Sequence, residues 1–471
     1  GVHAEGKVAI LQCGPAGEAR VRFACLVADG HNVAGRTGMG AVFGSKNLRA
    51  VVVRTRGDLH FADPEGLRDL ARRAVGRVDD AGFPSILRQH GTPGVVAIQA
   101  QGGNFASHNY TRGTIDGYER LDGGSYQPDL GAGETTCYGC VVRCRKKVRA
   151  TRPYPLTDRL GGPEFETLGM LGSNLDITDA AAVARASQLC GELGLDTITT
   201  GGLAGYLFEC VEHGLLSPGR IGRTLGFGRP DDLLWLIERI GRREGVGDVL
   251  ADGFHACLEA FGPQTAPFAV QVKNQGLPVH MPQVKPSQAL MYAVCPIGPD
   301  HQSCEHDWLL ASAGEDALGL GILGKGDAAS TGLAKVRMTV YSQYFYSLLD
   351  TLCLCMFCWG PGNLFTYPEI EELVRVTTGW HCTLWELMKV GERRVNLMRQ
   401  LNARRGFGRA DDRLPPRVFD PLPDGPSQGC HVDPDDFDAM RTTYYELMGW
   451  DPATGNPTPG KLRELGLEWA L

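Results

Sequence analysis

The sequence lacks the features that would tie it to a membrane or to nucleic acid. None of its apolar runs approaches the ~20 residues that a helix needs to cross a bilayer. Basic residues are in the minority, with 47 Lys and Arg against 54 Asp and Glu, so the net charge is −7. A nucleic-acid-binding protein usually carries a basic field. We therefore expect neither a membrane nor a nucleic acid as partner.

The sequence also has no internal repeat and no low-complexity tract. Apolar residues make up 43% of the 471 residues, which is enough for a substantial core and argues against a disordered chain. Cysteine is plentiful instead: there are 15, an odd number, and they are clustered. A chain of this size has little need of disulfides, and clustered thiols more often bind metal or stay reduced. We expect a reducing, cytoplasmic compartment.

The order of the sequence patterns predicts an α+β protein that is predominantly helical. A short β-rich part covers 1–60, with apolar runs at Val8–Gln12, Val21–Val27 and Leu48–Val53. Two mainly helical parts follow, 61–270 and 271–471. Asp63 and Pro64 predict a helix start and the spacing extends it to Arg77, whereas Thr383 to Glu386 form a capping box. Because a predicted strand follows Gly1 almost at once, we expect a fragment without its N-terminal part.

One group of cysteines has the spacing of a metal or cluster site. Cys137, Cys140 and Cys144 form C-x2-C-x3-C, which can present three thiolates to one face of a [4Fe–4S] cluster. A fourth ligand must come from elsewhere, and the segment 349–358 offers candidates. Structural zinc and buried inert cysteines are the alternatives. Arg143, Arg145, Lys146 and Lys147 flank the group and either offset cluster charge, face an electron carrier or form a solvated surface.

A glycine-rich loop at 34–46 carries four glycines and two cations. Backbone amides free of Cβ crowding can cradle an anionic group, although a tight structural turn gives the same pattern. The spacing matches neither a dinucleotide fingerprint nor a P-loop.

Taken together, these segments resemble the tungsten-containing aldehyde:ferredoxin oxidoreductase family over essentially the whole chain. The C-x2-C-x3-C loop and the glycine-rich loop both match that family, and Gly162 to Thr167 resembles its G-P-E-[YF]-E-T motif. Gly194 to Ile198 resembles the core of its first pterin motif, D-x-x-G-L-D, and Asp350 to Cys355 resembles the second, D-x-x-G-L-C. The C-terminal segment around Tyr444, Trp450 and Leu465 is also similar.

The resemblance implies a tungsten, or molybdenum, ion held by two pterins beside one [4Fe–4S] cluster. It further implies a small-molecule aldehyde as substrate, ferredoxin or a similar carrier as electron acceptor, and a homodimer. Residues 1–60 would be the C-terminal remnant of a β-rich pterin-binding domain. The helical part 61–270 would supply three of the cluster cysteines, and the part 271–471 would supply the fourth. The matching positions imply that the cluster ligands are Cys137, Cys140, Cys144 and Cys355. Cys353 and Cys358 would then not bind the cluster.

The same matches imply pterin contacts and catalytic residues. The pterin contacts are Leu195 and Asp196, then Asp350 and Leu354. The loop residues Gly35, Arg36, Thr37 and Gly38 would lie against pterin phosphate and Mg²⁺. Glu166 matches the family's pocket glutamate, which can activate water or accept a proton, and His301 matches its pocket histidine. A salt-bridged structural role is the alternative for Glu166.

Three positions depart from the family pattern. Gly191 replaces the first Asp of the first pterin motif, and Cys353 replaces the Gly of the second. Pro296 to His301 reads P-I-G-P-D-H where many members have N-R-G-x-x-H. Because the family's Arg is absent here, the sequence does not identify the substrate. Two further functions therefore stand beside aldehyde oxidation: a tungsten-dependent reductase of an acyl or aromatic CoA thioester, and a truncated, non-catalytic Fe–S protein.

Overall fold

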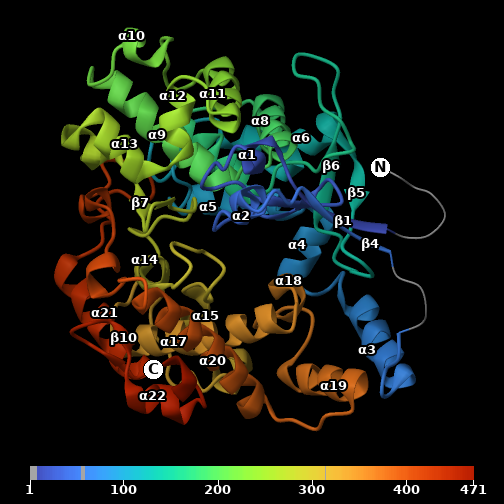
Figure 1. Ribbon diagram of the computed structural model, residues 1–471. Helices are drawn as coiled ribbons and strands as arrows, with labels where there is room; N and C mark the ends of the chain where they lie inside the picture. Colours follow the sequence, from blue (N-terminus) through green and yellow to red (C-terminus); the bar gives the residue numbers. More distant parts are fainter. Residues whose placement is uncertain (1–7, 55–58, 313) are drawn as a thin grey trace.

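The computed structural model describes residues 8–54, 59–312 and 314–471. It confirms the α+β class with helices dominant. A small sheet lies near the N-terminus, and helices form an upper and a lower part in the view of Figure 1. Among the described residues, no helix is both long and apolar enough to cross a bilayer. The boundaries near 60 and 270 stay predictions.

The N-terminal sheet has four antiparallel strands in the order β3-β2-β1-β4. They are β1 Val8–Cys13, β2 Leu26–Ala28, β3 Asn32–Ala34 and β4 Ala50–Arg54. In the central strand β1, Leu11 pairs with Ala28 on one side and Val51 on the other. The apolar run Val8–Gln12 of the sequence lies within β1.

The apolar run Val21–Val27 enters the sheet only at Leu26. The preceding residues bond to a distant turn: Cys25 donates its N–H to the carbonyl of Gly194 at 2.9 Å, and Phe23 accepts from the N–H of Asp196 at 3.2 Å. These bonds fix the turn at 194–196 against the N-terminal part, which is a tertiary contact that local strand propensity does not reveal.

Two short helices support the glycine-rich loop. They are α1 Pro15–Glu18 and α2 Met39–Ser45, and they cross at backbone contact. A Cβ on Gly44 would lie 1.8 Å from the carbonyl oxygen of Gly17, so only glycine fits there. Gly38 precedes α2 with φ +72°, and its Cβ would lie 2.1 Å from the carbonyl oxygen of Arg22. The close packing at these two glycines therefore fixes the position of the loop.

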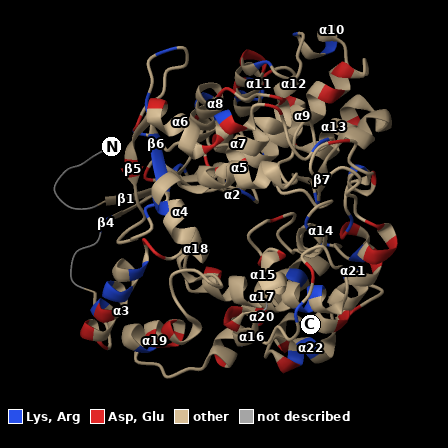
Figure 2. Cartoon of the chain, turned by 180° about the vertical axis from the view of Figure 1, so that it is seen from behind, with Lys and Arg blue, Asp and Glu red and all other residues tan. Residues whose placement is uncertain are grey.

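The upper part is built mainly from helices around the first pterin-like motif. They are α7 Phe165–Met170, α8 Ala180–Leu193, α9 Thr197–Glu212, α11 Pro230–Arg242 and α12 Val246–Ala251. Helix α9 is buried on nearly every face. A two-stranded ribbon, β5 Gly131–Thr135 and β6 Arg145–Val148, projects beside them, and Figure 2 shows basic residues along β6.

The lower part is built mainly from α14 Pro286–Val294, α17 Leu333–Thr351, α20 Leu384–Ala403 and α21 Pro434–Met448. Helix α3 Pro64–Arg77, early in the chain, packs on α19 Tyr367–Thr378 (Figure 1). Arg73 and Arg77 of α3 form ion pairs with Glu369 of α19 at 3.0 and 2.9 Å. As predicted, the Asp63 side chain caps α3 and the Thr383 capping box opens α20.

A buried charge cluster joins Lys273 to the helices α20 and α21 of the lower part. Lys273 Nζ lies 2.8 Å from Asp412 Oδ1, and Arg399 donates to both oxygens of Asp412 at 2.9 and 2.7 Å. The hydroxyl of Tyr445 also donates to Asp412, at 2.6 Å. Arg399 and Asp412 are fully buried, so each charge relies on the others for stabilisation.

Candidate active site

Glu166 lies in the first turn of α7, is buried, and points toward two histidines. Its Oε2 accepts the backbone N–H of Val279 at 2.7 Å, which fixes the carboxylate. Its Oε1 has no hydrogen-bond partner among the described residues. The nearest ring nitrogens are Nε2 of His301 at 3.6 Å and Nε2 of His280 at 3.8 Å. The structure thus brings Glu166, His301 and His280 together.

Burial raises the pKa of Glu166 above its ordinary value, although the charges of His301 and Arg36 oppose the shift. Burial also lowers the pKa of His280 well below its usual range, so this ring is neutral. A buried carboxylate with one free oxygen beside a neutral imidazole is a proton-handling arrangement.

The glycine-rich loop brings Arg36 to the same region. Its Nη2 donates to the carbonyl of Gly276 at 2.7 Å, whereas its buried Nη1 has no partner among the described residues. A buried guanidinium nitrogen without an acceptor fits an anionic group. Thr37, with φ +70°, is exposed and leads into the left-handed Gly38.

The first pterin-like motif borders a cavity of about 110 Å³. Gly35, Leu195 and Asp196 all line it, so residues far apart in the sequence meet there as expected. Asp196 also caps α9 by accepting from the N–H groups of Ile198 and Thr199. Gly191 lines the same cavity, and no described atom lies within 4 Å of where its Cβ would be. The Asp of the family motif would therefore project into open space.

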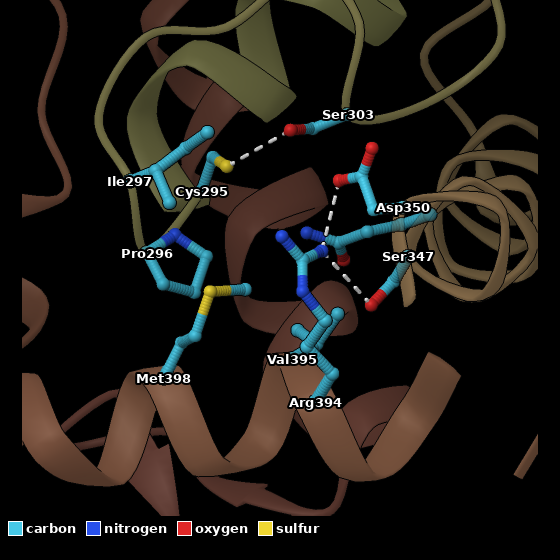
Figure 3. A pocket seen from close by; sticks show the side chains of 10 residues that line it. Cys295, Pro296, Ile297, Ser303, Ser347, Asp350, Arg394, Val395 and Met398 are labelled. Carbon is cyan, nitrogen blue, oxygen red and sulfur yellow. Dashed lines mark hydrogen bonds and ion pairs between the residues drawn. The ribbon is translucent and has the colours of Figure 1, made fainter. Parts of the chain in front are cut away.

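The second motif borders a smaller cavity of about 20 Å³, shown in Figure 3. Arg394 of α20 donates to Asp350 Oδ2 at 2.9 Å and to Ser347 Oγ at 3.3 Å. Burial raises the pKa of Asp350, and Arg394 opposes the shift. Ile297, at the position of the family's Arg, gives this cavity an apolar wall. Leu354 does not line it and packs against the smaller apolar core.

Three of the four predicted cluster cysteines, Cys140, Cys144 and Cys355, interact electrostatically. Cys140 and Cys144 are half-buried, and Cys355 precedes α18 Met356–Trp359. Burial raises the pKa of Cys144, and the charges of Glu164, Cys355 and Cys140 add to this shift. Cys137 is exposed at the edge of the group. A fifth thiol, Cys358, lies with its Sγ 3.9 Å from that of Cys140.

Within the described part of the chain, these thiols do not converge on a single point. Among the described residues, no three His, Cys, Asp or Glu side chains are close enough to hold one metal ion. A tetrahedral zinc site would need four such ligands within bond distance of one point. Cys353 is exposed with φ +56°, the left-handed conformation suited to the glycine of the family motif.

Family models match nearly the whole chain. The model "Aldehyde ferredoxin oxidoreductase, domains 2 & 3" matches residues 69–467, and the N-terminal-domain model of the same name matches residues 2–55. The chain belongs to the aldehyde ferredoxin oxidoreductase family. This confirms the resemblance inferred from the motifs and makes the protein an oxidoreductase by family.

Relatives within this family share about a third of the sequence. The tungsten-containing aldehyde ferredoxin oxidoreductase of Pyrococcus furiosus is 32% identical over 98% of this chain and 74% of its own length. The aliphatic sulfonate oxidoreductase, WOR-like subunit, of the same organism is 28% identical over 98% of this chain and 70% of its own. The active-site complex BamBC of benzoyl coenzyme A reductase shares the fold, with a TM-score of 0.77, 20% identity and coverage of 99% and 74%.

Sequence reasoning missed three residues of this candidate site: His280, Lys285 and His306. His280 stands alone in the apolar segment Leu277–Met281, which was the available signal. Lys285 and His306 follow no spacing rule, because only the folded chain brings them beside His280.

Proposed function

We propose that the chain oxidises an aldehyde to a carboxylic acid at a tungsten, or molybdenum, bis-pterin centre. Electrons would pass through a [4Fe–4S] cluster to ferredoxin or a similar carrier. The observation that carries the proposal is the free Oε1 of buried Glu166 between two histidines, in a member of this family.

Residues of both pterin-like motifs line cavities, which supports two pterin sites. Gly35, Leu195 and Asp196 would hold one of them, since all three line one cavity. Asp350 and Leu354 would hold the other, near the cavity that Asp350 lines. The unpartnered Nη1 of Arg36 supports a phosphate and its Mg²⁺ at the loop 35–38.

The thiols fit an iron–sulfur cluster. Cys137, Cys140, Cys144 and Cys355 would be its ligands, because the last three act on one another and Cys137 comes from the same short loop. The basic residues beside them are largely engaged: Arg143 and Lys146 pair with Glu134, and Arg145 donates to the carbonyl of His31. They stabilise the ribbon that carries the loop.

The protein residues would handle the protons of the reaction. Oxidation of an aldehyde with water gives a carboxylate, three protons and two electrons. When bound, the metal centre supplies the acceptor for the electron pair. Glu166 Oε1 would take a proton from the attacking water, and His301 Nε2 would hold the carbonyl oxygen. Burial of Glu166 excludes bulk water from this step.

Metal analysis together with an activity assay tests the proposal. Protein purified without oxygen should contain tungsten or molybdenum together with iron. It should reduce a viologen dye with aldehydes but not turn over acyl or aromatic CoA thioesters with reduced dye. Iron without either heavier metal, and no aldehyde activity, would contradict the proposal in favour of a non-catalytic Fe–S protein. Turnover of the thioesters alone would favour the reductase.

A further inference from the structure

A polar group that consists of Lys285, His280 and His306 lies beside Glu166 and has no role in the chemistry proposed above. Lys285 directly precedes α14 and reaches two imidazoles with its ammonium group. Its Nζ lies 2.8 Å from Nδ1 of His306 and 3.5 Å from Nδ1 of His280. The rings of His280 and His306 stand edge to face, with centroids 4.7 Å apart. The group thus connects Lys285 to the ring that faces Glu166.

The proton position on His280 follows from its neighbours. Asn104 Oδ1 accepts the N–H of Met281 at 2.7 Å, which fixes the orientation of the Asn104 amide. The amide nitrogen of Asn104 therefore donates to Nδ1 of His280, at 2.9 Å. Because the ring is neutral, its own proton is on Nε2, the nitrogen that faces Glu166 Oε1 at 3.8 Å.

His306 is fixed in the same way. Its Nδ1 accepts from Lys285, and its Nε2–H donates to the carbonyl of His301 at 3.0 Å. Burial lowers its pKa well below the usual range, so it too is neutral. His306 anchors the ammonium group without competing for the proton. The line from Lys285 through His280 to Glu166 is then a set of alternating donors and acceptors.

We propose that Lys285 exchanges protons with Glu166 through His280, as the proton store of the active site. From the observed tautomer, an N–H bond of the Lys285 ammonium breaks and an N–H bond forms at His280 Nδ1, while the N–H bond at Nε2 breaks and an O–H bond forms at Glu166 Oε1. Ammonium and carboxylate become neutral Lys285 and protonated Glu166, so charge and atoms balance, and the ring proton is left on Nδ1. This transfer serves reduction. In aldehyde oxidation the same bonds break and form in reverse, from protonated Glu166 to neutral Lys285. The inference rests on the proposed function, because that chemistry puts a proton on Glu166.

Lys285 can change charge near neutrality. Burial lowers its pKa to about 8, against the opposing charges of Asp307, Glu305 and Glu166. Two of these carboxylates are engaged elsewhere: Asp307 binds Lys335, and Glu305 accepts from Tyr346 and Trp308. The gap of 3.8 Å at Glu166 is the one long link, and such contacts often shorten when substrate binds.

Opposite pH dependences in the two directions test the proposal. Oxidation needs neutral Lys285, so its rate should rise with pH through about 8. Reduction of the acid by reduced viologen needs the ammonium, so its rate should fall through the same pH. Lys285→Met should lose both dependences and about 10²-fold in rate. Lys325→Met, at an exposed lysine, is the matched control and should behave as wild type.

A second measurement is independent of turnover. Competitive acetylation with acetic anhydride, read by mass spectrometry against pH, reports the pKa of Lys285 in the folded protein. The expected midpoint is about 8, and it should fall in Glu166→Gln, since the Glu166 charge raises the pKa of Lys285. A midpoint like that of Lys325, or no shift in Glu166→Gln, would overturn the inference even in inactive protein. An unchanged pH profile in Lys285→Met would do the same, whereas missing tungsten or aldehyde activity concerns only the proposed function.

Discussion

The thiol of Cys358 lies 3.9 Å from that of Cys140, within hydrogen-bond distance. The hydrogen bond from Cys358 lowers the pKa of Cys140 to about 5, so Cys140 is a thiolate at neutral pH. A thiolate is the form that binds iron. Cys358 therefore stands beside the proposed cluster as a donor to its ligands.

Replacing these two cysteines should separate a ligand from its neighbour. Cys140→Ala should remove the iron and bleach the brown colour, because it deletes a ligand. Cys358→Ala should keep the iron and lower the reduction potential of the cluster, because a hydrogen bond to a ligand sulfur is lost. Iron analysis and EPR-monitored potentiometry make the comparison, with Cys382→Ala as control. Full iron in Cys140→Ala would refute its assignment as a ligand.

Glu166→Gln should separate activity from stability. The amide oxygen can still accept from Val279, so the fold is kept, but the base is lost and the rate should fall about 10²- to 10⁴-fold. Because burial raises the pKa of Glu166, folding favours its protonated form, and the ionised form costs stability at neutral pH. The variant should therefore melt at a higher temperature than wild type at neutral pH.

That difference in melting temperature should shrink as the pH is lowered through the raised pKa of Glu166, where the wild-type carboxyl becomes neutral as well. Calorimetry at several pH values measures it. An equal melting temperature at neutral pH would mean that the carboxylate is stabilised by a partner in the folded protein.

Gly191→Asp should restore the acceptor that the first pterin motif lacks. The side chain would enter open space at the larger cavity, so stability should change by less than about 1 kcal/mol. Metal analysis should show higher tungsten occupancy than in wild type. Gly76→Asp, on the surface of α3 with similarly open space, should leave the metal content unchanged. Lower occupancy in Gly191→Asp would show that this wall of the cavity touches the cofactor differently.

Asp412→Asn should destabilise the protein by about 3–5 kcal/mol, because it leaves Arg399 and Lys273 buried without a countercharge. Asp438→Asn, which breaks ion pairs of a half-exposed side chain, should cost no more than about 1 kcal/mol. Urea unfolding of both variants gives the comparison. Similar losses in the two would argue against a role for the buried cluster.

Local signals in the sequence were enough to predict where the capped helices begin. Asp63 and Thr383 begin helices where predicted, because a cap is a local hydrogen-bond pattern. The apolar run 21–27 predicts a strand, but residues 21–25 lie outside the sheet because their backbone bonds to the turn at 194–196. His280 and Lys285 could not be predicted from the sequence for the same reason, because their contacts form only when distant segments fold together.

The seat of α2 on α1 limits how this protein can vary. With Gly44 against Gly17 there is no room for even one methyl group, and a larger side chain would push the segment bearing Arg36 away from Glu166. Adaptation to a new substrate would then have to proceed elsewhere, for example at the wall of the smaller cavity, where Pro296 and Ile297 already differ from the family pattern.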